Sequence, residues 1–411
     1  MNIVFGIIVG IFVLMGLIVA HELGHFIAAR RNGVTVKEFG ICFPPRALAW
    51  IKGKDGKWHR IPKKDWDKPQ KSLVLSLNWL PIGGFCSMDG ESDADTRKGT
   101  FGAATFWQKT KILFAGVAAN WLVAFLILTV LAFTGMPHFV DNQFTIKGDT
   151  NVSPGIVTVK SVVENSPATK AGFKEGDQIL RAAPNPDCLA DQNCSEATDI
   201  VDATSVTSFN KAHTESLVYY NVWRDNAEIQ LAATLNNDEA PYLLGVSMSQ
   251  NGQALYRSTW SAPLVGAVTT VQLTGATFEG LGTLLWNLCS GIISQASFDD
   301  GTREQGREAI GAAGDSVSGP VGIIGTIFPA FTQAGPTNVA FLAALISVSL
   351  ACINVIPIPA LDGGRWLLIA IYRLLHKKLT KATEERIVSR AFIILLALIV
   401  IITILDITRL F

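Results

Sequence analysis

A short motif near the start of the chain has the clearest chemical meaning: residues 21–25 read His-Glu-Leu-Gly-His. On a helix, residues four apart share one face, so His21 and His25 can offer two imidazole nitrogens to one metal ion. Glu22 lies one step further round, where its carboxylate can act as general base toward a water molecule on that metal. The spacing therefore predicts a zinc site that performs hydrolysis. The alternative is a helix end at which these side chains only meet interfacial water.

Two histidines do not complete a catalytic zinc site, which needs a third protein ligand and one position open to water. The extended form of the motif has a third histidine six residues after the second; Arg31 stands there, so that class is excluded. Asp362 is the stronger candidate, because the prolines before it and the glycines after it break a helix where irregular backbone must line a cavity or be buried. Glu38 is the nearest acid after the motif, but it lies beyond a basic boundary. Alternatively, Asp362 only caps a helix that begins near Arg365.

The elements that must position these residues are mostly apolar helices. Of the 411 residues 49% are hydrophobic and 17% are charged, with a mean hydropathy of +0.33, which argues against an ordinary soluble enzyme and a disordered chain. Residues 3–20 carry no charge and would form a helix of about 27 Å, nearly the thickness of the hydrocarbon core. Further spans are expected at 112–135, 339–357 and 391–404. The sequence predicts a polytopic α-helical membrane protein with about four spans.

Charge is unevenly distributed, although the formal net charge is zero. Residues 30–111 contain 16 Lys and Arg against 8 Asp and Glu, whereas residues 137–336 contain 10 against 21. Basic segments beside apolar spans mark the cytoplasmic side, so we expect the acidic block and both termini on the extracytoplasmic side. A neutral net charge gives no global attraction to nucleic acid, and no such partner is expected.

The acidic block between the second and third spans is long enough for a separate domain. Alternating apolar residues predict strands at 156–159, 179–180, 217–223 and 229–234, with a short helix after Ser166. These elements predict a small α/β barrel-like module of about 80 residues. Residues 260–288 are mildly apolar but rich in Gly and Thr, which indicates a helix on the membrane surface rather than a span.

Residues 72–88, on the expected cytoplasmic side, alternate in polarity and contain a tight turn that ends with Gly83 and Gly84. This pattern predicts a β-hairpin that dips toward the metal. Proteases hold substrates extended, and an edge strand can bind an extended chain by strand addition. We therefore expect substrate binding near Gly83 and Gly84; the alternative is a plain interfacial hairpin.

Six cysteines are too few for a disulfide scaffold in a chain of 411 residues, and the lack of a C-x-x-C pair argues against a thiolate zinc site and a redox motif. Cys188 and Cys194 flank a polar loop in the block expected outside the cytoplasm. The sequence leaves open whether they form a disulfide or remain two unpaired thiols.

The two metal motifs, in this order, resemble those of the site-2 proteases, a family of intramembrane zinc metalloproteases, and in particular the bacterial regulator-of-sigma-E protease type. Residues 21–25 match the metal-binding motif of that family, and residues 354–364 match its N-x-x-P-x-P-x-L-D-G-G motif. Residues 81–85 also resemble a family segment. The resemblance implies a Zn²⁺ cofactor and the following site residues: His21, His25 and Asp362 as metal ligands, Glu22 as catalytic base, and Asn354, Gly83 and Gly84 in substrate binding.

The resemblance also implies a domain map. Residues 1–136 would be an N-terminal membrane domain, 150–245 a PDZ-like domain, 255–336 an extracytoplasmic linker with the membrane-surface helix, and 337–411 a C-terminal membrane domain. Several close relatives have two tandem PDZ modules, whereas one clear signature is present here, and residues 184–202 look like an insertion within it.

The function implied is cleavage of transmembrane segments of single-span membrane proteins in regulated intramembrane proteolysis, for example of anti-sigma factors or signal-peptide remnants. The protein would lie in membrane lipid as a multi-pass protein of the inner (plasma) membrane. Two other classes compete with this interpretation. A membrane metal transporter would need further ionisable residues along the spans, and a non-catalytic PDZ scaffold would have no use for Glu22.

Overall fold

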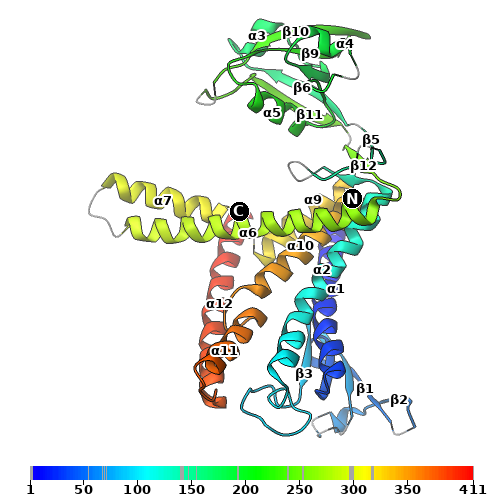
Figure 1. The fold of residues 1–411 in the computed structure, drawn as a ribbon, viewed down its shortest axis with the longest axis vertical. Coiled ribbons are helices and arrows are strands. Elements are labelled where there is room, and N and C mark those ends of the chain that lie inside the picture. The colour runs from blue at the N-terminus through cyan, green and yellow to red at the C-terminus, as the bar shows by residue number, and fades with distance from the viewer. Residues whose placement is uncertain are drawn as a thin grey trace. The chain divides into compact units, whose positions relative to one another are not determined.

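The computed structural model describes residues 3–53, 55–66, 68, 70, 72–138, 143–146, 148–153, 155–191, 194–237, 240–251, 254–295, 300–315 and 319–410. This described chain divides into two compact units. The first combines Met1–Val130 with Gly266–Phe411 and holds the long apolar helices, and the second, Leu131–Val265, holds most of the strands (Figure 1).

Four helices of the described chain are long and apolar enough to cross a membrane: α1 (Ile3–Arg31), α2 (Phe106–Thr134), α10 (Pro336–Val355) and α12 (Lys381–Leu410). Each overlaps one of the four predicted spans, so the four predicted apolar helices are present, and the fold is compatible with a helical membrane protein of about four spans. α1 continues past the predicted span to Arg31, so residues 21–25 lie on a helix, as the spacing of the histidines requires.

The third span ends where the prolines predict. α10 stops at Val355, an irregular turn follows, and α11 (Asp362–Leu374) begins at Asp362. This turn is tightly packed, because a Cβ at Gly363 would overlap the carbonyl oxygen of Val355, and a Cβ at Gly364 would overlap the backbone of the turn itself. The two glycines are therefore needed for the close approach that sets the start of α11.

A sheet with the order β2-β1-β3 follows α1; it consists of β1 (Val36–Lys52), β2 (Trp58–Arg60) and β3 (Val74–Met88). The predicted hairpin within residues 72–88 is wrong. Its two halves lie on either side of the first part of β1. Residues 36–41 of β1 are in register with 84–88, and residues 38–41 are also in register with 74–77. Residues 48–51 of β1 then pair with 74–77 as well. The turn was correctly located, but both arms find their partner in β1, which is long enough to bend and offer two pairing segments.

α6 (Ala262–Gln295) is one continuous helix that covers the predicted region 260–288. Its part in the first unit crosses the direction of α1 and α2 (Figure 1). Trp121 of α2 donates its indole N–H to Thr274 of α6 at 2.9 Å, so the two helices are in direct contact. The position of α6 at a membrane surface stays a prediction.

Short helices lead from α6 back to the third span: α7 (Asp300–Asp315), α8 (Pro320–Gly322), the π-helical turn η2 (Ile323–Ile327) and α9 (Phe328–Ala334). α9 packs directly on α1, where a Cβ at Gly10 would lie 2.8 Å from the ring of Phe328 and a Cβ at Gly6 would meet Pro329. The glycines in the first half of α1 therefore allow close helix packing.

The second unit is built on a sheet whose described strands run in the order β10-β9-β7-β6-β11, with β8 paired to β7. The strands are β6 (Ile156–Val162), β7 (Gln178–Ala183), β8 (Thr198–Asp199), β9 (Leu217–Arg224), β10 (Ala227–Thr234) and β11 (Val246–Asn251). The four predicted strands correspond to β6, β7, β9 and β10. The sequence analysis missed β11, which pairs with β6 at one edge of the sheet.

Helices α3 (Pro167–Ala171) and α5 (Ala203–Ala212) accompany this sheet, and the buried core contains Val157, Val206, Val218 and Tyr220. The predicted cap is present, since the hydroxyl of Ser166 accepts a hydrogen bond from the backbone N–H of Thr169 at 3.2 Å. A small sheet brings the two ends of the unit together; its strands are β4 (Met136–Pro137), β12 (Leu255–Arg257) and β5 (Asn151–Ser153).

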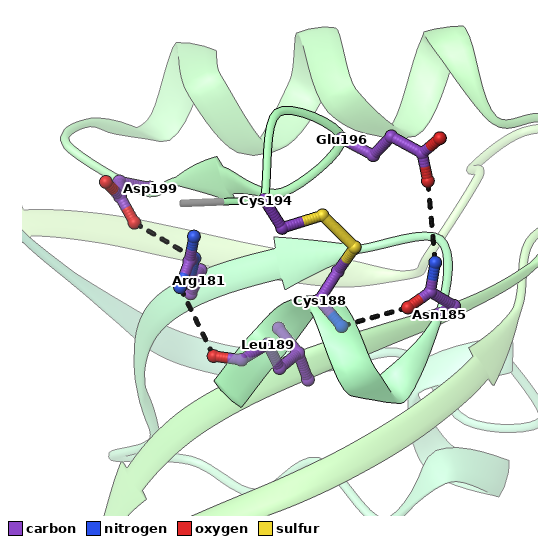
Figure 2. The surroundings of a disulfide bond; sticks show 7 residues. All are labelled: Arg181, Asn185, Cys188, Leu189, Cys194, Glu196 and Asp199. Atoms are coloured by element: carbon purple, nitrogen blue, oxygen red, sulfur yellow. Dashed lines mark hydrogen bonds and ion pairs between the residues drawn. A yellow bond between two sulfur atoms is a disulfide. The ribbon is translucent and has the colours of Figure 1, made fainter. Parts of the chain in front are cut away.

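The predicted insertion within the module contains α4 (Pro186–Ala190), and Figure 2 shows that it is closed by a disulfide between Cys188 and Cys194. Of the two possibilities that the sequence leaves open, the structure has the disulfide. The Asn185 side chain caps α4 by accepting from the N–H of Cys188 at 2.9 Å, and Arg181 of β7 donates to the carbonyl of Leu189 at 3.3 Å. The insertion is thus tied both to itself and to the sheet.

Candidate metal centre

Three potential ligand atoms meet where α1 faces the start of α11. Nε2 of His21 and Nε2 of His25 each lie 3.2 Å from Oδ2 of Asp362, and the two nitrogens lie 3.1 Å from each other. Both histidines are buried. The structure therefore brings together residues that are more than 330 positions apart in the chain, in the combination that the sequence predicts.

The geometry of these atoms fits a zinc ion. With bonds of about 2.0–2.1 Å and tetrahedral angles, two ligand atoms on one zinc lie about 3.4 Å apart. The three separations here are only slightly shorter. Oδ2 of Asp362 is buried and, among the described residues, has no hydrogen-bond donor, so a cation would give this oxygen its missing partner. His21, His25 and Asp362 are thus suited to hold Zn²⁺.

α2 holds the two imidazoles from the opposite side through residues spaced four apart. Nδ1 of His25 lies 2.8 Å from the carbonyl oxygen of Ile112 and must donate to it, which leaves Nε2 with its lone pair toward the metal position. The side-chain amide of Asn120, which is fully buried, lies 3.5 Å from Nδ1 of His21. Each histidine therefore has an orienting group on α2.

Gly116 lies between these two positions on α2 and leaves the space that the imidazoles fill. A Cβ at Gly116 would overlap Nε2 of His25 and would lie 2.6 Å from Cε1 of His21. On α1, a Cβ at Gly24, the residue directly before His25, would overlap the backbone of Ala115. The two glycines allow α1 and α2 to approach closely at the level of the metal position.

The expected base and one expected substrate residue line the same cavity of about 250 Å³ as the three ligands; they are Glu22 and Asn354. The amide of Asn354 donates to the carbonyl of Leu350, one turn back on α10, at 2.9 Å. Gly84 of β3 lies against α1, where its Cβ would be 3.8 Å from Cγ of Glu22. Gly83 does not line this cavity in the described chain; it has a φ of +91° and packs beside Phe43.

Contacts in the structure bear on both alternatives for the acidic ligand. Glu38 is bound in a bidentate pair with Arg46, whose Nε lies 3.1 Å from Oε1, so this carboxylate is engaged away from the histidines. Asp362 is the first residue of α11, but among the described contacts its side chain makes no capping hydrogen bond and turns to His21 and His25 instead. Its position supports a ligand rather than a cap.

Several residues around the centre escaped the sequence analysis. Gly116 and Asn120 gave no periodic signal, although a polar Asn inside an apolar span is costly and often functional. Cys86 and Arg365 also line the cavity, from β3 and from the first turn of α11. Both residues lie next to motif residues in the sequence, but neither belongs to a pattern of residues that is typical of a metal site.

The sequence also matches a known family over nearly its whole length. Residues 9–399 match the model of peptidase family M50. The chain belongs to this family. It is 28% identical over 401 residues to a protein of Clostridium perfringens whose name describes a zinc metalloprotease, with 98% of each chain covered. It is 25% identical over 460 aligned positions to the regulator of sigma-W protease RasP of Bacillus subtilis, with 96% of each chain covered.

This family membership confirms the resemblance found in the motifs. The protein is an intramembrane zinc metalloprotease, and Zn²⁺ is its cofactor. A peptidase family leaves no support for the metal transporter or for the non-catalytic scaffold. The residues that hold the metal, the side of the membrane on which each part lies and the substrates are matters for the proposal below.

Proposed function

We propose that this M50 peptidase cleaves the transmembrane segments of single-span membrane proteins, with zinc bound by His21, His25 and Asp362 and with Glu22 as general base. The observation that supports the proposal is the meeting of three ligand atoms within 3.2 Å of one another, beside Glu22, where the apolar helix α1 faces the start of α11. The name of the Bacillus subtilis relative supports a role in regulated intramembrane proteolysis, with anti-sigma factors or signal-peptide remnants as candidate substrates.

The chain's own residues divide the chemistry between them. When bound, zinc lowers the pKa of a coordinated water to about 7 and polarises the scissile carbonyl. Glu22 takes the proton of the attacking water and can pass it to the leaving amine. A substrate helix must first unwind, because its carbonyls are bonded to amides four residues on. The edge of β3 near Gly84 lies beside Glu22 and can hold the freed chain extended, with Asn354 binding its backbone.

Replacing Asp362 with alanine should lower the zinc content of the purified protein severalfold or more, because two imidazoles alone hold zinc weakly. Metal analysis of detergent-purified protein measures this directly, beside cleavage of a single-span reporter with and without chelator. Glu385→Ala is the matched control, since this acid is exposed and is not among the three residues whose ligand atoms meet. If zinc content is unchanged and only the melting temperature falls, Asp362 is structural.

The second unit is proposed to be a PDZ-like domain on the extracytoplasmic side that admits only substrates whose outer domain has been removed. The excess of acidic residues in this unit supports the extracytoplasmic side. The pairing of its two end strands, β5 and β12, also makes the proposal testable by deletion. Ser153 at the end of β5 and Leu255 at the start of β12 are paired in register, so their Cα atoms lie about 5 Å apart. Residues 155–253 can therefore be replaced by two or three glycines without separating the ends.

This deletion should spare the chemistry, since His21, Glu22, His25 and Asp362 all belong to the other unit. The shortened enzyme should cleave a reporter that still carries its bulky outer domain, which the intact enzyme refuses, and should continue to cleave a pre-trimmed reporter. Gel assays of both reporters against both enzymes give the result. A uniform loss of rate on both reporters would instead identify the unit as a docking platform that raises local substrate concentration.

A further inference from the structure

The segment that joins β1 to β3 carries an excess of positive charge that the proteolytic site does not use. Residues 52–71 contain eight Lys and Arg against three Asp, a net charge of +5. Six of these cations lie among the described residues with exposed side chains, and one of them, Lys68, is paired with Asp65. We name the other five the basic arm: Lys52, Lys57, Arg60, Lys63 and Lys64. They lie at the end of β1, in or beside β2, and in the short helix η1 (Lys63–Asp65).

The sheet that carries the basic arm stands alongside α1 rather than beyond its end. Sγ of Cys42, near the bend of β1, lies 3.5 Å from Sδ of Met15. Met15 is sixteen residues before the end of α1 at Arg31, which is about 24 Å along the helix axis. β1 therefore runs back from the end of α1 deep into the zone that this span crosses.

The register places the basic arm at the opposite, shallow end of this sheet. Ile51 pairs with Val74, and Val74 is also in register with Glu38, close to where the chain leaves α1. Lys52 then pairs with Trp58 of β2. The basic arm is thus level with the end of α1, where a spanning helix passes from hydrocarbon to head groups.

The exposed side chains of the sheet follow the same polarity. At the deep end Trp79 is 71% exposed and Leu80 is 50% exposed, as apolar groups that face lipid can be. At the shallow end the exposed groups include the five cations and Trp58, as at a membrane–water interface, where aromatic rings and Lys or Arg side chains gather. The sheet is therefore polarised along the direction of α1.

Among the described residues, the cations of the basic arm have no acidic partner. The two described acids of this segment have other partners: Asp55 binds His59 at 2.9 Å, and Asp65 binds Lys68 at 2.6 Å. Five exposed charges at head-group level attract an oppositely charged surface.

We propose that the basic arm binds the head groups of anionic phospholipids at the membrane boundary where α1 ends. Bound head groups would fix the shallow end of the sheet and so hold the β3 edge beside Glu22. The proposal goes beyond the proposed function and does not rest on the zinc ligands, because zinc content and lipid binding are measured separately.

The test uses full-length protein in detergent, titrated with phosphatidylglycerol or with phosphatidylcholine of the same acyl chains, and counts bound lipids by native mass spectrometry. The wild type should retain phosphatidylglycerol in preference to phosphatidylcholine. A variant with Lys52, Lys57, Lys63 and Lys64 changed to glutamine should bind phosphatidylglycerol about tenfold or more weakly. The matched control changes four exposed lysines of the second unit to glutamine, namely Lys160, Lys170, Lys174 and Lys211, and should bind as the wild type does.

A set of four Lys→Arg changes at the same positions of the basic arm should keep the binding, because charge and not folding of the arm is what is tested. The proposal is overturned if the glutamine variant binds phosphatidylglycerol like the wild type, if phosphatidylcholine binds equally well, or if the control variant loses as much. It is also overturned if lipid binding is unchanged while only cleavage of a reporter with an acidic juxtamembrane segment falls. That last result would assign the basic arm to a protein partner.

Discussion

Replacing Glu22 with glutamine should abolish peptide-bond cleavage while the purified protein still contains zinc. Glutamine keeps the size of the side chain and its place in the cavity but cannot accept the proton of the attacking water. A general base contributes about 10²–10⁴-fold to the rate, so cleavage of a single-span reporter should fall by at least that range. The zinc content should match that of the wild type, since Glu22 is not one of the three residues whose ligand atoms meet at the metal position.

The neighbouring carboxylate Glu91 makes this prediction sharper. Glu91 lines the same cavity, but its Oε1 accepts a hydrogen bond from the backbone N–H of Met88 at 3.0 Å and its side chain is exposed. Glu91→Gln should therefore reduce the rate far less than Glu22→Gln. The assigned role of Glu22 is refuted if Glu22→Gln cleaves at a near wild-type rate, and an inactive Glu91→Gln beside it would transfer the role to Glu91.

The parts of this protein that could be predicted are those that local sequence determines. Continuous apolar stretches give the four spans, because each helix satisfies its backbone internally and needs only about 20 apolar residues to cross. The pair His21 and His25 follows from the helical period. Asp362 could be found despite its distance in the chain, because an acid beside helix-breaking residues at the end of a span is costly unless it has a partner.

The pairing of the sheet β2-β1-β3 could not be predicted in the same way. The turn at residues 81–84 is a local signal, and it suggested a hairpin within residues 72–88, whose two arms would pair with each other. The structure instead inserts residues 36–41 between them. That choice depends on a strand nearly 40 residues earlier in the chain and on its bend between Phe43 and Arg46, neither of which the local alternation of residues 72–88 can report.

The support that α2 gives the histidines was also beyond the reach of sequence patterns. Gly116 is required because of two imidazoles that lie more than 90 positions earlier in the chain, and a glycine in a span has no periodicity of its own. The carbonyl of Ile112 is a backbone group, so its side chain tells nothing about the bond to His25. Of these three α2 residues, Asn120 was the one with a signal in the sequence, because it is a polar residue in an apolar helix.

Gly116→Ala is the change that tests this support most directly, and we expect it to lower zinc affinity about 10–100-fold, as loss of the groups that orient metal ligands does. The added methyl group would overlap Nε2 of His25 and lie 2.6 Å from Cε1 of His21, so both imidazoles must leave the positions in which they meet Asp362. Competition with a calibrated chelator measures the affinity, and reporter cleavage should fall with it.

Two further variants separate this effect from general damage to the helix pair. Ala118→Val changes an exposed position two residues along α2, about 200° round the helix, and should leave zinc affinity and cleavage unchanged. Gly24→Ala overlaps the backbone of Ala115 instead of the imidazoles, so it should lower the melting temperature through packing of α1 on α2. If Gly116→Ala lowers only the melting temperature, as Gly24→Ala does, while zinc affinity per folded molecule stays at the wild-type value, then Gly116 serves helix packing and does not make room for the metal ligands.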